Sequence, residues 1–569
     1  MKAVLICCIS LFLFCDNVHA QNVQPGTDTV KIIQIVQGRS FRHKTLDSLN
    51  ELLTIAGDAV LKQGSTLFYC DSVTLNKKTN IIQAFGNVKI NQGDTIQTYS
   101  QFLKYLGNEQ QAYLSKNVKL VDKKGSLLTQ ALEYNLKTGI GKYNTGGKVI
   151  NNKTTITSED GIYYADTKDV YFINKVHVID PQNNIRADTL LYNMTTEGAN
   201  FIGPTEIKNK SATIYTSNGT YDLKNNTGLF KNRSTIVDSS KRTYTADNIA
   251  FDKVSGNGQM EGNAVITDSV DGFITTGNLI LLNNNNNSFL ATRKPVLLVL
   301  QGKDTTYISG DTLFSGYTVK RKSISKIDTT LNKAESDSVQ HSNDSAMVER
   351  LLLPSDTLRM DENTKTKNHA GKNNVPAGKQ DSVRFFIAYH HVKIFNDSLQ
   401  SVSDSLYYST ADSVFKLFQK PVVWSGVSQI TGDTMLLFTK NKKADRLYVF
   451  NNGMLVSKSK GTFYNQMAGK TLNGYFINGE IDYMRVKGSP AESIYYIQEK
   501  DSSYEGMNRA TGELIDIYFS KSAVQKVKFV NDVHGVLHPI RLLDKETKFL
   551  KNFMWLDKRR PKNKLELFE

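Results

Sequence analysis

Cysteine is almost absent from this chain outside its N-terminal stretch. The sequence has 4 cysteines, and Cys7, Cys8 and Cys15 fall in the first apolar segment, which leaves Cys70 alone in the remainder. A single cysteine forms no disulfide within its own chain, so a buried apolar core must hold the fold. Tryptophan (2) and proline (10) are also scarce, whereas Tyr (26), Phe (27) and Gly (38) suit strands joined by turns.

The signatures of common catalytic and nucleotide sites are missing as well. The chain has no glycine-rich phosphate loop, no Cys/His spacing typical of a metal site and no Gly-x-Ser-x-Gly elbow in a convincing context. His390 and His391 look like a metal pair, but they stand where other copies of the repeat described below carry Gly-Asn. Neighbouring residues of a strand also point to opposite faces, so both cannot bind one ion. We predict a protein without enzymatic activity, cofactor or metal.

Aspartates recur along the chain in a way that argues against catalysis. A catalytic carboxylate pair is expected once, whereas these residues return from layer to layer. We therefore interpret them as turn or hydrogen-bonding residues. The clearest examples are Asp188, Asp247, Asp404 and Asp433.

Long apolar runs are confined to the N-terminus. Met1-Lys2, the apolar run from Ala3 to Phe14 and the small residue Ala20 have the order of a secretory signal peptide, so we expect cleavage after residue 20. That run is too short to span a bilayer, and no later segment approaches 18 apolar residues. We expect an exported protein; the family resemblance described below implies that it lies in the periplasm, free or associated with the outer membrane.

The net charge of +15 favours anionic partners, such as phosphate head groups or a membrane surface, and the alternative is a generally basic surface without a partner. Nucleic acid is not expected, because the chain is exported and carries no nucleic-acid-binding motif. The densest basic cluster is Lys558–Lys564. Such clusters are usually solvated tails, with a docking role as the alternative. We interpret residues 546–569 as a basic C-terminal tail.

A short motif returns at a nearly constant interval. Its clearest copy is Ala187-Asp188-Thr189-Leu190-Leu191-Tyr192-Asn193, in which Asp188 is the reference position. The steps between reference positions are 30, 29, 30, 28, 29, 30, 30 and 34 residues, and after an interruption the last two lie 29 apart. This period indicates stacked units, each of which buries its apolar face against the next. The reference positions are Asp71, Gln101, Gln130, Asp160, Asp188, Ser217, Asp247, Gly277, Asp311, Asp404 and Asp433.

The repeat predicts strands. Positions two and four residues after the reference are apolar in nearly every copy, and residues separated by two lie on the same face of a strand. A helix would need spacings of three and four. Each unit ends in a second strand, which begins with a short element such as Gly86-Asn87-Val88-Lys89-Ile90. We predict an all-β stack of antiparallel repeats of about 29 residues, arranged in two blocks.

Composition divides the chain into segments. Repeats cover residues 29–319 and 381–545. Between them, residues 320–380 are rich in Ser, Asp, Lys, Asn and Thr and poor in aromatics, which is typical of a flexible insert or linker.

The motif resembles the repeat of the OstA-like (LptA-like) lipopolysaccharide-transport family. The resemblance rests on Ala187–Asn193, on Ala246-Asp247-Asn248-Ile249-Ala250-Phe251-Asp252 and on Gly86–Ile90, and it covers most of residues 30–320 and 385–465. It implies an open β-jellyroll with an apolar trough. It also implies a periplasmic module that carries lipopolysaccharide, shields the acyl chains of lipid A and joins other transport components, or a second copy, by end-to-end strand pairing.

On this interpretation the apolar columns line the trough. The alternative is that the same side chains fill a closed β-solenoid core of a structural or adhesive scaffold. A polysaccharide-processing β-helix enzyme would need a carboxylate cluster in one or two neighbouring layers, and none is found. The candidate lining residues are Leu132, Tyr134, Ile162, Tyr164, Leu190, Tyr192, Ile249 and Phe251.

Overall fold

The computed structural model describes residues 32–569 apart from 94–95, 302–303, 320–381, 441–442, 460, 499–502, 522 and 545. The predicted signal peptide (1–20) and polar insert (320–380) therefore lie outside the described residues. The described chain is built from antiparallel strands and three short 3-10 helices, without an α-helix, so the all-β prediction is confirmed. No helix within these ranges is long and apolar enough to cross a membrane. The chain divides into two compact units, unit 1 up to Asp271 and unit 2 from Gly272.

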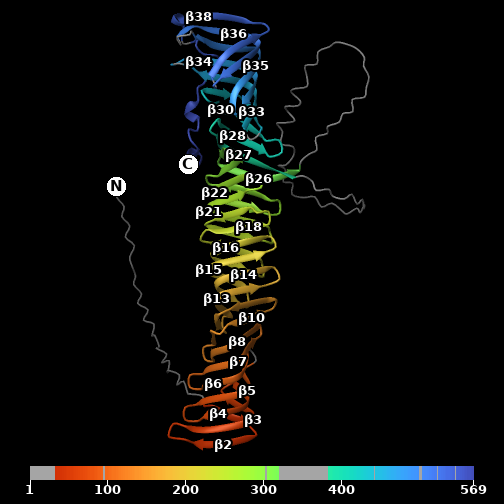
Figure 1. The fold of residues 1–569 in the computed structure, drawn as a ribbon, viewed down its shortest axis with the longest axis vertical. Coiled ribbons are helices and arrows are strands. Elements are labelled where there is room, and N and C mark those ends of the chain that lie inside the picture. Colours follow the sequence, from red (N-terminus) through yellow and green to blue (C-terminus); the bar gives the residue numbers. More distant parts are fainter. Residues whose placement is uncertain are drawn as a thin grey trace, which may run out of the picture. The chain divides into compact units, whose positions relative to one another are not determined.

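In unit 1 the strands follow one another in chain order (Figure 1). They are β1 (Gln34–Gln37), β2 (Ser40–Thr45), β3 (Glu51–Gln63), β4 (Thr66–Asn76), β5 (Ile81–Gln92), β6 (Ile96–Leu106), β7 (Gln111–Asp122), β8 (Gly125–Asn135), β9 (Ile140–Tyr143), β10 (Gly147–Asn151), β11 (Thr154–Ser158), β12 (Asp160–Tyr164), β13 (Asp169–Ile179), β14 (Asn183–Asn193), β15 (Gly198–Asn209), β16 (Ala212–Asp222), β17 (Thr227–Lys231), β18 (Ser234–Asp238), β19 (Thr243–Ala246), β20 (Asn248–Asp252) and β21 (Asn257–Asp268).

Unit 2 repeats this pattern with longer strands near its end. Its elements are β22 (Phe273–Asn283), β23 (Ser288–Thr292), β24 (Val296–Gln301), β25 (Asp304–Ser309), β26 (Thr312–Val319), β27 (Ser382–Phe395), β28 (Gln400–Ser409), β29 (Val414–Phe418), β30 (Val422–Ser425), β31 (Ser428–Thr431), β32 (Thr434–Lys440), β33 (Lys443–Lys458), β34 (Tyr464–Ile477), β35 (Glu480–Gln498), β36 (Tyr504–Ser520), β37 (Ala523–Val530), β38 (His534–Pro539), η1 (Ile540–Leu542), η2 (Asp557–Arg559) and η3 (Lys564–Leu567).

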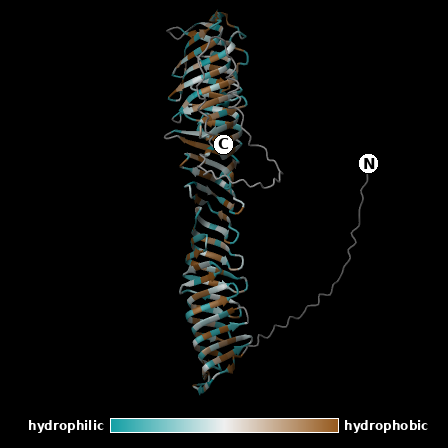
Figure 2. Cartoon of the chain, turned by 90° about the vertical axis from the view of Figure 1, so that its right-hand side faces the viewer, coloured by the Kyte–Doolittle hydropathy of each residue, from teal (hydrophilic) through white to brown (hydrophobic). Residues whose placement is uncertain are grey.

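Each repeat bends in the middle and so contributes to two walls. In β5 the first half, Ile81–Phe85, pairs with one part of β6, the second half, Val88–Gln92, pairs with another, and the register shifts between them. We call the wall that contains Ile81–Phe85 the first wall and the wall that contains Val88–Gln92 the second wall. Hydrophobic and hydrophilic residues alternate along the strands (Figure 2). Buried and exposed side chains alternate in the same way, and the buried ones on the inner faces of both walls form the core.

The bend is made by two consecutive residues with positive φ, which we call the corner. At Gly86 and Asn87 φ is 70° and 42°. Left-handed backbone favours Gly and Asn, which explains the Gly-Asn element of the sequence repeat. The reference aspartate of the preceding strand holds the corner, because Asn87 Nδ2 donates to Asp71 Oδ2 at 3.0 Å. Other corners are Lys116-Asn117, Asn174-Lys175, Asn232-Arg233, Gly262-Asn263, His390-His391, Gln419-Lys420 and Asn451-Asn452.

The reference aspartates and the histidine pair therefore have structural places. Asp433 accepts a hydrogen bond from Asn452 Nδ2 at 2.8 Å, and Asp247 accepts one from Asn263 Nδ2 at 2.9 Å. The Nδ1 atoms of His390 and His391 lie 3.1 and 2.9 Å from different acids, Asp404 and Asp311. The interpretation of the aspartates as hydrogen-bonding residues is confirmed for these copies.

The last residue of the motif forms the turn at the far end of the first wall. Asn193 Oδ1 accepts hydrogen bonds from the N–H groups of Thr195 and Thr196 at 3.0 and 2.9 Å. Asp222 repeats this arrangement one layer on, with Lys224 and Asn225 as donors. Each part of the motif thus has a structural role. The aspartate binds the corner of the next strand, the two apolar residues point inward, and the final Asn or Asp closes the turn.

The division into units does not coincide with the two blocks predicted at residues 29–319 and 381–545. β26 pairs with β27 residue by residue from Thr312↔Tyr389 to Val319↔Ser382, so strands on both sides of the insert belong to unit 2.

We predict that Gly86→Ala destabilises the protein more than Gly93→Ala. Both glycines have positive φ, 70° and 64°, so both changes cost roughly 1–2 kcal/mol in backbone strain. A Cβ at position 86 would lie 2.2 Å from Asp71 Oδ2, whereas one at position 93 would meet nothing within 4 Å. Thermal unfolding of the two variants measures the difference, and equal melting temperatures would contradict the role given to the corner.

Candidate functional site

The interior of unit 1 contains most of the predicted lining residues. Leu132, Tyr134, Leu190, Tyr192 and Ile249 are buried, at 0–1% exposure, on the inner face of the first wall. Phe251 is partly buried against the same core. These six residues lie where the repeat predicts them.

The assignment of Ile162 and Tyr164 to the interior is wrong. Gly161 and Tyr163 occupy the inner positions of β12, and Tyr163 is only 4% exposed. Ile162 pairs with the exposed Lys142 and is half-buried on the outer face, as is Tyr164. A displacement of one residue along a strand moves every side chain to the other face.

The cause of that slip is the choice of Asp160 as a reference position. The exposed residue before the two inward positions is Glu159, not Asp160. Glu159 restores steps of 29 residues to Gln130 and to Asp188. The constant spacing of Tyr105, Tyr134, Tyr163, Tyr192 and Tyr221, each 29 residues after the last, is the signal that identifies Tyr163 from the sequence.

Large and small side chains alternate along the inner column to which Tyr134 belongs. The residue that pairs with each aromatic ring on the neighbouring strand is Gly, Ala or Val. The rings therefore pack over small side chains. A Cβ on Gly228 would lie 2.7 Å from the Phe251 ring. In pairing order the column reads Tyr134, Gly141, Tyr163, Val170, Tyr192, Ala199, Tyr221, Gly228 and Phe251.

The second wall supplies the facing apolar column. It is mostly Ile, Val and Leu, and its members pair from strand to strand along the whole of unit 1. Next to Tyr163 and Met194 the interior holds a cavity of only about 10 Å³, which has room for about one water molecule. The column is Phe68, Ile90, Thr98, Leu120, Leu127, Val149, Ile156, Val178, Ile185, Ile207, Ile214, Ile236, Tyr244 and Ile266.

The side of unit 1 opposite the corners, which we call the mouth, is closed between Gln63 and Tyr192 by hydrogen bonds between the walls. Tyr134 Oη donates to Gln92 Oε1 at 3.2 Å, and Gln92 Nε2 donates to the carbonyl of Leu136 at 2.9 Å. One repeat earlier, Tyr105 and Gln63 are bonded in the same way, with Gln63 Nε2 2.9 Å from the carbonyl of Gly107. The hydroxyl and the carbonyl two residues later thus hold one amide side chain.

Two more copies continue this arrangement. Tyr163 Oη donates to Asp122 Oδ2 at 2.7 Å. Asn151 Nδ2 lies 3.1 Å from Tyr192 Oη and 2.9 Å from the carbonyl of Met194. We call the pairs Tyr105–Gln63, Tyr134–Gln92, Tyr163–Asp122 and Tyr192–Asn151 the tyrosine ladder, and each pair a rung.

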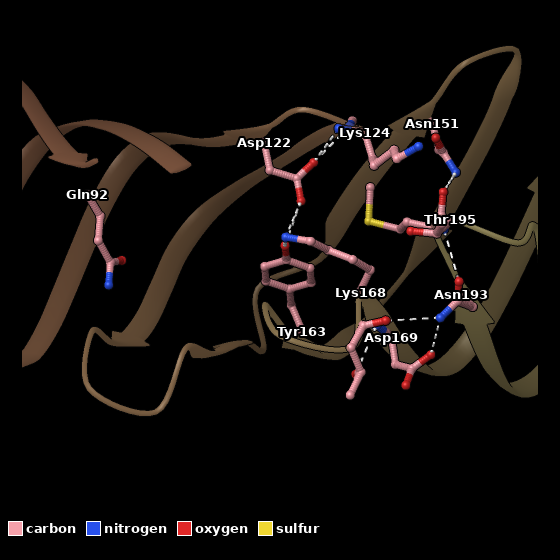
Figure 3. A network of polar contacts seen from close by, with 12 residues as sticks. Gln92, Asp122, Lys124, Asn151, Tyr163, Lys168, Asp169, Asn193 and Thr195 are labelled. Atoms are coloured by element: carbon pink, nitrogen blue, oxygen red, sulfur yellow. Dashed lines mark hydrogen bonds and ion pairs between the residues drawn. The ribbon is translucent and has the colours of Figure 1, made fainter. Parts of the chain in front are cut away.

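The third rung carries charge (Figure 3). Lys168 Nζ lies 3.3 Å from Asp122 Oδ2 and 3.4 Å from Tyr163 Oη. Burial opposes ionisation of Asp122, but the hydrogen bonds from Tyr163 and from the N–H groups of Lys124 and Gly125, with the charge of Lys168, outweigh it. The pKa of Asp122 is therefore held below its ordinary value.

Burial acts on the ladder tyrosines in the opposite sense. It raises the pKa of Tyr134 and of Tyr192 to about 12. It also raises the pKa of Tyr105, and that of Tyr163, where the hydrogen bond to Asp122 adds to the effect. The ladder is thus built to keep its hydroxyls neutral.

Unit 2 has comparable apolar columns but no such ladder in its described part. The inner column that corresponds to the tyrosines reads Ser315, Phe386, Tyr408, Phe415, Leu437, Leu447, Gly474, Met484 and Ile517. A cleft of about 210 Å³ opens there, with Ile394, Leu399, Phe415 and Leu437 among its apolar lining and Lys443 among its polar lining.

The C-terminal segment, residues 546–569, packs on the outer face of the second wall of unit 2. Gln466 and Gln429, both fully buried, bind its main chain with both ends of their amides. Gln466 Nε2 donates to the carbonyl of Lys548 at 2.8 Å and Oε1 accepts from the N–H of Leu550 at 2.9 Å. Gln429 makes the same pair of bonds, at 2.8 and 2.7 Å, with Met554 and Leu556.

The contacts of this segment recur every six residues. After Lys548 and Met554 comes Arg560, which donates from Nε and Nη2 to Gln400 Oε1 at 2.8 and 2.6 Å. The carbonyl of Glu566 then accepts from Lys393 of β27 at 3.3 Å, and the chain ends beside that strand (Figure 1). Apolar side chains fill the spaces between these contacts: Leu550, Phe553 and Trp555 pack against Met454, Val456, Ile494, Tyr496 and Met507. The segment predicted as a basic tail thus forms a third layer on unit 2.

The described residues form no cluster typical of a metal centre. Within the described ranges, no group of three or more His, Cys, Asp or Glu side chains is placed to hold a metal ion. Cys70, the one cysteine among the described residues, is buried, and burial raises the pKa of its thiol to about 12, so it is a poor nucleophile. The inner surfaces offer apolar packing and a few hydrogen-bonding groups at their edge.

A family model and a solved structure each match part of this chain. Residues 33–188 match the family model described as OstA-like protein. The resemblance predicted from the repeat is confirmed for this segment, which includes the first three ladder tyrosines.

Among solved structures, the chain is similar to LptH from Pseudomonas aeruginosa, described as the LptA homologous periplasmic component of the conserved lipopolysaccharide transport device. The identity is 20%, the match covers 20% of this chain and 80% of LptH, and the TM-score is 0.18. No curated protein sequence matches the chain.

We predict that unit 1 loses stability as the pH rises from about 10 toward 12. An exposed tyrosine ionises near pH 10, whereas burial raises the pKa of the ladder tyrosines in the folded protein, to about 12 at Tyr134 and Tyr192. Their contribution is complete below the unfolded pKa and is lost as the pH approaches the folded value. Melting temperatures between pH 9 and pH 12 test this, with Tyr134→Phe/Tyr192→Phe as the control that should flatten the profile.

We also predict that Gln429→Ala frees the C-terminal segment. The change leaves the Met554 carbonyl and the Leu556 N–H without these partners, at a cost of about 2 kcal/mol for two net hydrogen bonds. Tryptic cleavage within residues 546–569 should become at least tenfold faster. Gln525→Ala, an exposed change on β37, serves as the control, and equal rates for the two variants would contradict the arrangement.

Proposed function

We propose that this protein is a periplasmic carrier or bridge for lipopolysaccharide, which shields the acyl chains of lipid A between the two walls of unit 1. The observation that carries the proposal is the pair of apolar columns that face each other through successive repeats of a unit containing an OstA-like segment.

The physical demand on such a carrier is continuous shielding. Each methylene exposed to water costs about 0.8 kcal/mol, so an acyl chain cannot cross an aqueous compartment unprotected. Layers that repeat Leu, Ile, Val and Tyr at equivalent positions offer similar surroundings in each repeat. A chain that leaves one layer therefore finds an equivalent environment in the next, which favours sliding over release.

The proposed partners follow from the ends of the stack. Strand β2 is exposed, and among the described strands it pairs only with β3. Its other edge therefore offers backbone N–H and C=O groups to a further strand. Such an edge accepts another strand by β-augmentation. Other components of a lipopolysaccharide-transport device, or a second copy of this chain, would join there.

The packed interior favours a second candidate function. At the level of the third rung a cavity of about 10 Å³ admits no acyl chain, and a core closed in this way is what a structural or adhesive scaffold requires. The two functions differ in whether lipid enters between the walls, and this can be measured directly.

We predict that p-benzoyl-phenylalanine at Phe201 crosslinks to lipopolysaccharide. Phe201 is fully buried on the inner face of β15, and the analogue keeps its aromatic ring. The matched control is the same analogue at Ile202, the next residue, which faces outward and is 46% exposed. Ultraviolet illumination of the mature protein with purified lipopolysaccharide, followed by detection of the shifted band, makes the comparison.

Crosslinking at Phe201 that unlabelled lipid A competes away, with little at Ile202, supports the carrier. Crosslinking at Ile202 alone indicates adhesion to the outer surface. A folded protein that crosslinks at neither position is a scaffold, and the proposed function is then rejected.

A further inference from the structure

The geometry of unit 1 leaves one route into its interior. On the corner side the walls are joined by the peptide chain itself, as at Gly86-Asn87, where each strand passes from one wall to the other. On the opposite side the walls end in separate turns and meet through side chains. There the tyrosine ladder joins them, one rung in each repeat from Gln63 to Tyr192.

We propose that the mouth of unit 1 is the lateral entrance for cargo, and that the ladder rungs are the residues that open to admit it. The inference rests on the proposed function, because it names where and how a lipid reaches the apolar columns. Its ligand class is an amphiphile with several acyl chains and a head that bears hydroxyl and phosphate groups.

The rungs are suited to open one at a time. Each is held by two or three hydrogen bonds between side chains or to a carbonyl, and the walls on either side stay paired within themselves. A net hydrogen bond of ordinary strength shifts an opening equilibrium by about fivefold. Opening one rung therefore leaves the next repeat closed, so a lipid can advance while the ladder closes behind it.

An open rung exposes groups that match the head of such an amphiphile. Gln63, Gln92 and Asn151 release amide donors and acceptors, and the third rung releases the Lys168 cation from Asp122. Asn151 can accept a further hydrogen bond even in the closed ladder. It is fully buried, and its Oδ1 has no hydrogen-bond partner among the described residues. A buried acceptor of that kind costs free energy until a donor reaches it, and a sugar hydroxyl at the mouth would supply one.

The test is the rate at which fluorescently labelled lipopolysaccharide enters the mature protein, measured by stopped flow. The variants are Tyr134→Phe and the combination of Tyr105→Phe, Tyr134→Phe, Tyr163→Phe and Tyr192→Phe. Phenylalanine keeps the rings that pack in the column and removes only the hydroxyls. We expect uptake to rise about fivefold for each rung that must open, so the combined variant exceeds the single one.

A control variant carries the same number of Tyr→Phe changes on outward-facing or half-buried tyrosines of unit 1, namely Tyr113, Tyr164, Tyr171 and Tyr215. Its uptake should equal that of the unchanged protein. If all proteins bind at one rate, the entrance proposal is overturned while the carrier function stands. If neither the unchanged protein nor any variant takes up lipid, the carrier function itself fails. The single variant decides the matter should the combined one not fold.

Discussion

Everything in this fold depends on a pair of left-handed residues in the middle of a strand. Without the corner, a repeat would be one straight ribbon with a single apolar face and nothing to bury it against. With it, the same strand supplies two walls, and its inward residues meet those of its own second half. Gly and Asn are common at this position, Lys, Arg and Gln also occur, and in one repeat His390-His391 occupy it, so a sequence that looks like a metal motif is better understood as backbone geometry.

The sequence predicts the parts of the fold that are decided locally. Inward positions two residues apart identify the strands and place Leu132, Tyr134, Leu190, Tyr192 and Ile249 inside, because a buried face demands apolar residues at every second position. The same logic fails at Ile162 and Tyr164 for a reason that is also local: Glu159 and Asp160 are both acceptable residues at the reference position, and residue type alone does not choose between them. Only the spacing of the tyrosines does.

What the sequence does not reveal are contacts whose partners have no pattern of their own. The partner of Tyr134 is a glutamine 42 residues earlier, and that of Tyr163 is an aspartate 41 residues earlier. Gln, Asp and Asn are ordinary residues at the end of a strand, so nothing marks them as one class until the walls are brought together. The C-terminal segment is hidden for a similar reason: its period of six belongs to the spacing of glutamines on another surface and matches neither a helix nor a strand.

That period of six has an evolutionary consequence. Repeat proteins commonly grow or shrink by gaining or losing whole repeats, and in unit 1 a new layer would need only its own rung. In unit 2 the segment spans the stack from Gln466 through Gln429 to Gln400, and it advances six residues between successive glutamines. An added layer between them would leave the segment too short, and a lost layer would leave it slack. The segment acts as a ruler that fixes the number of repeats it covers.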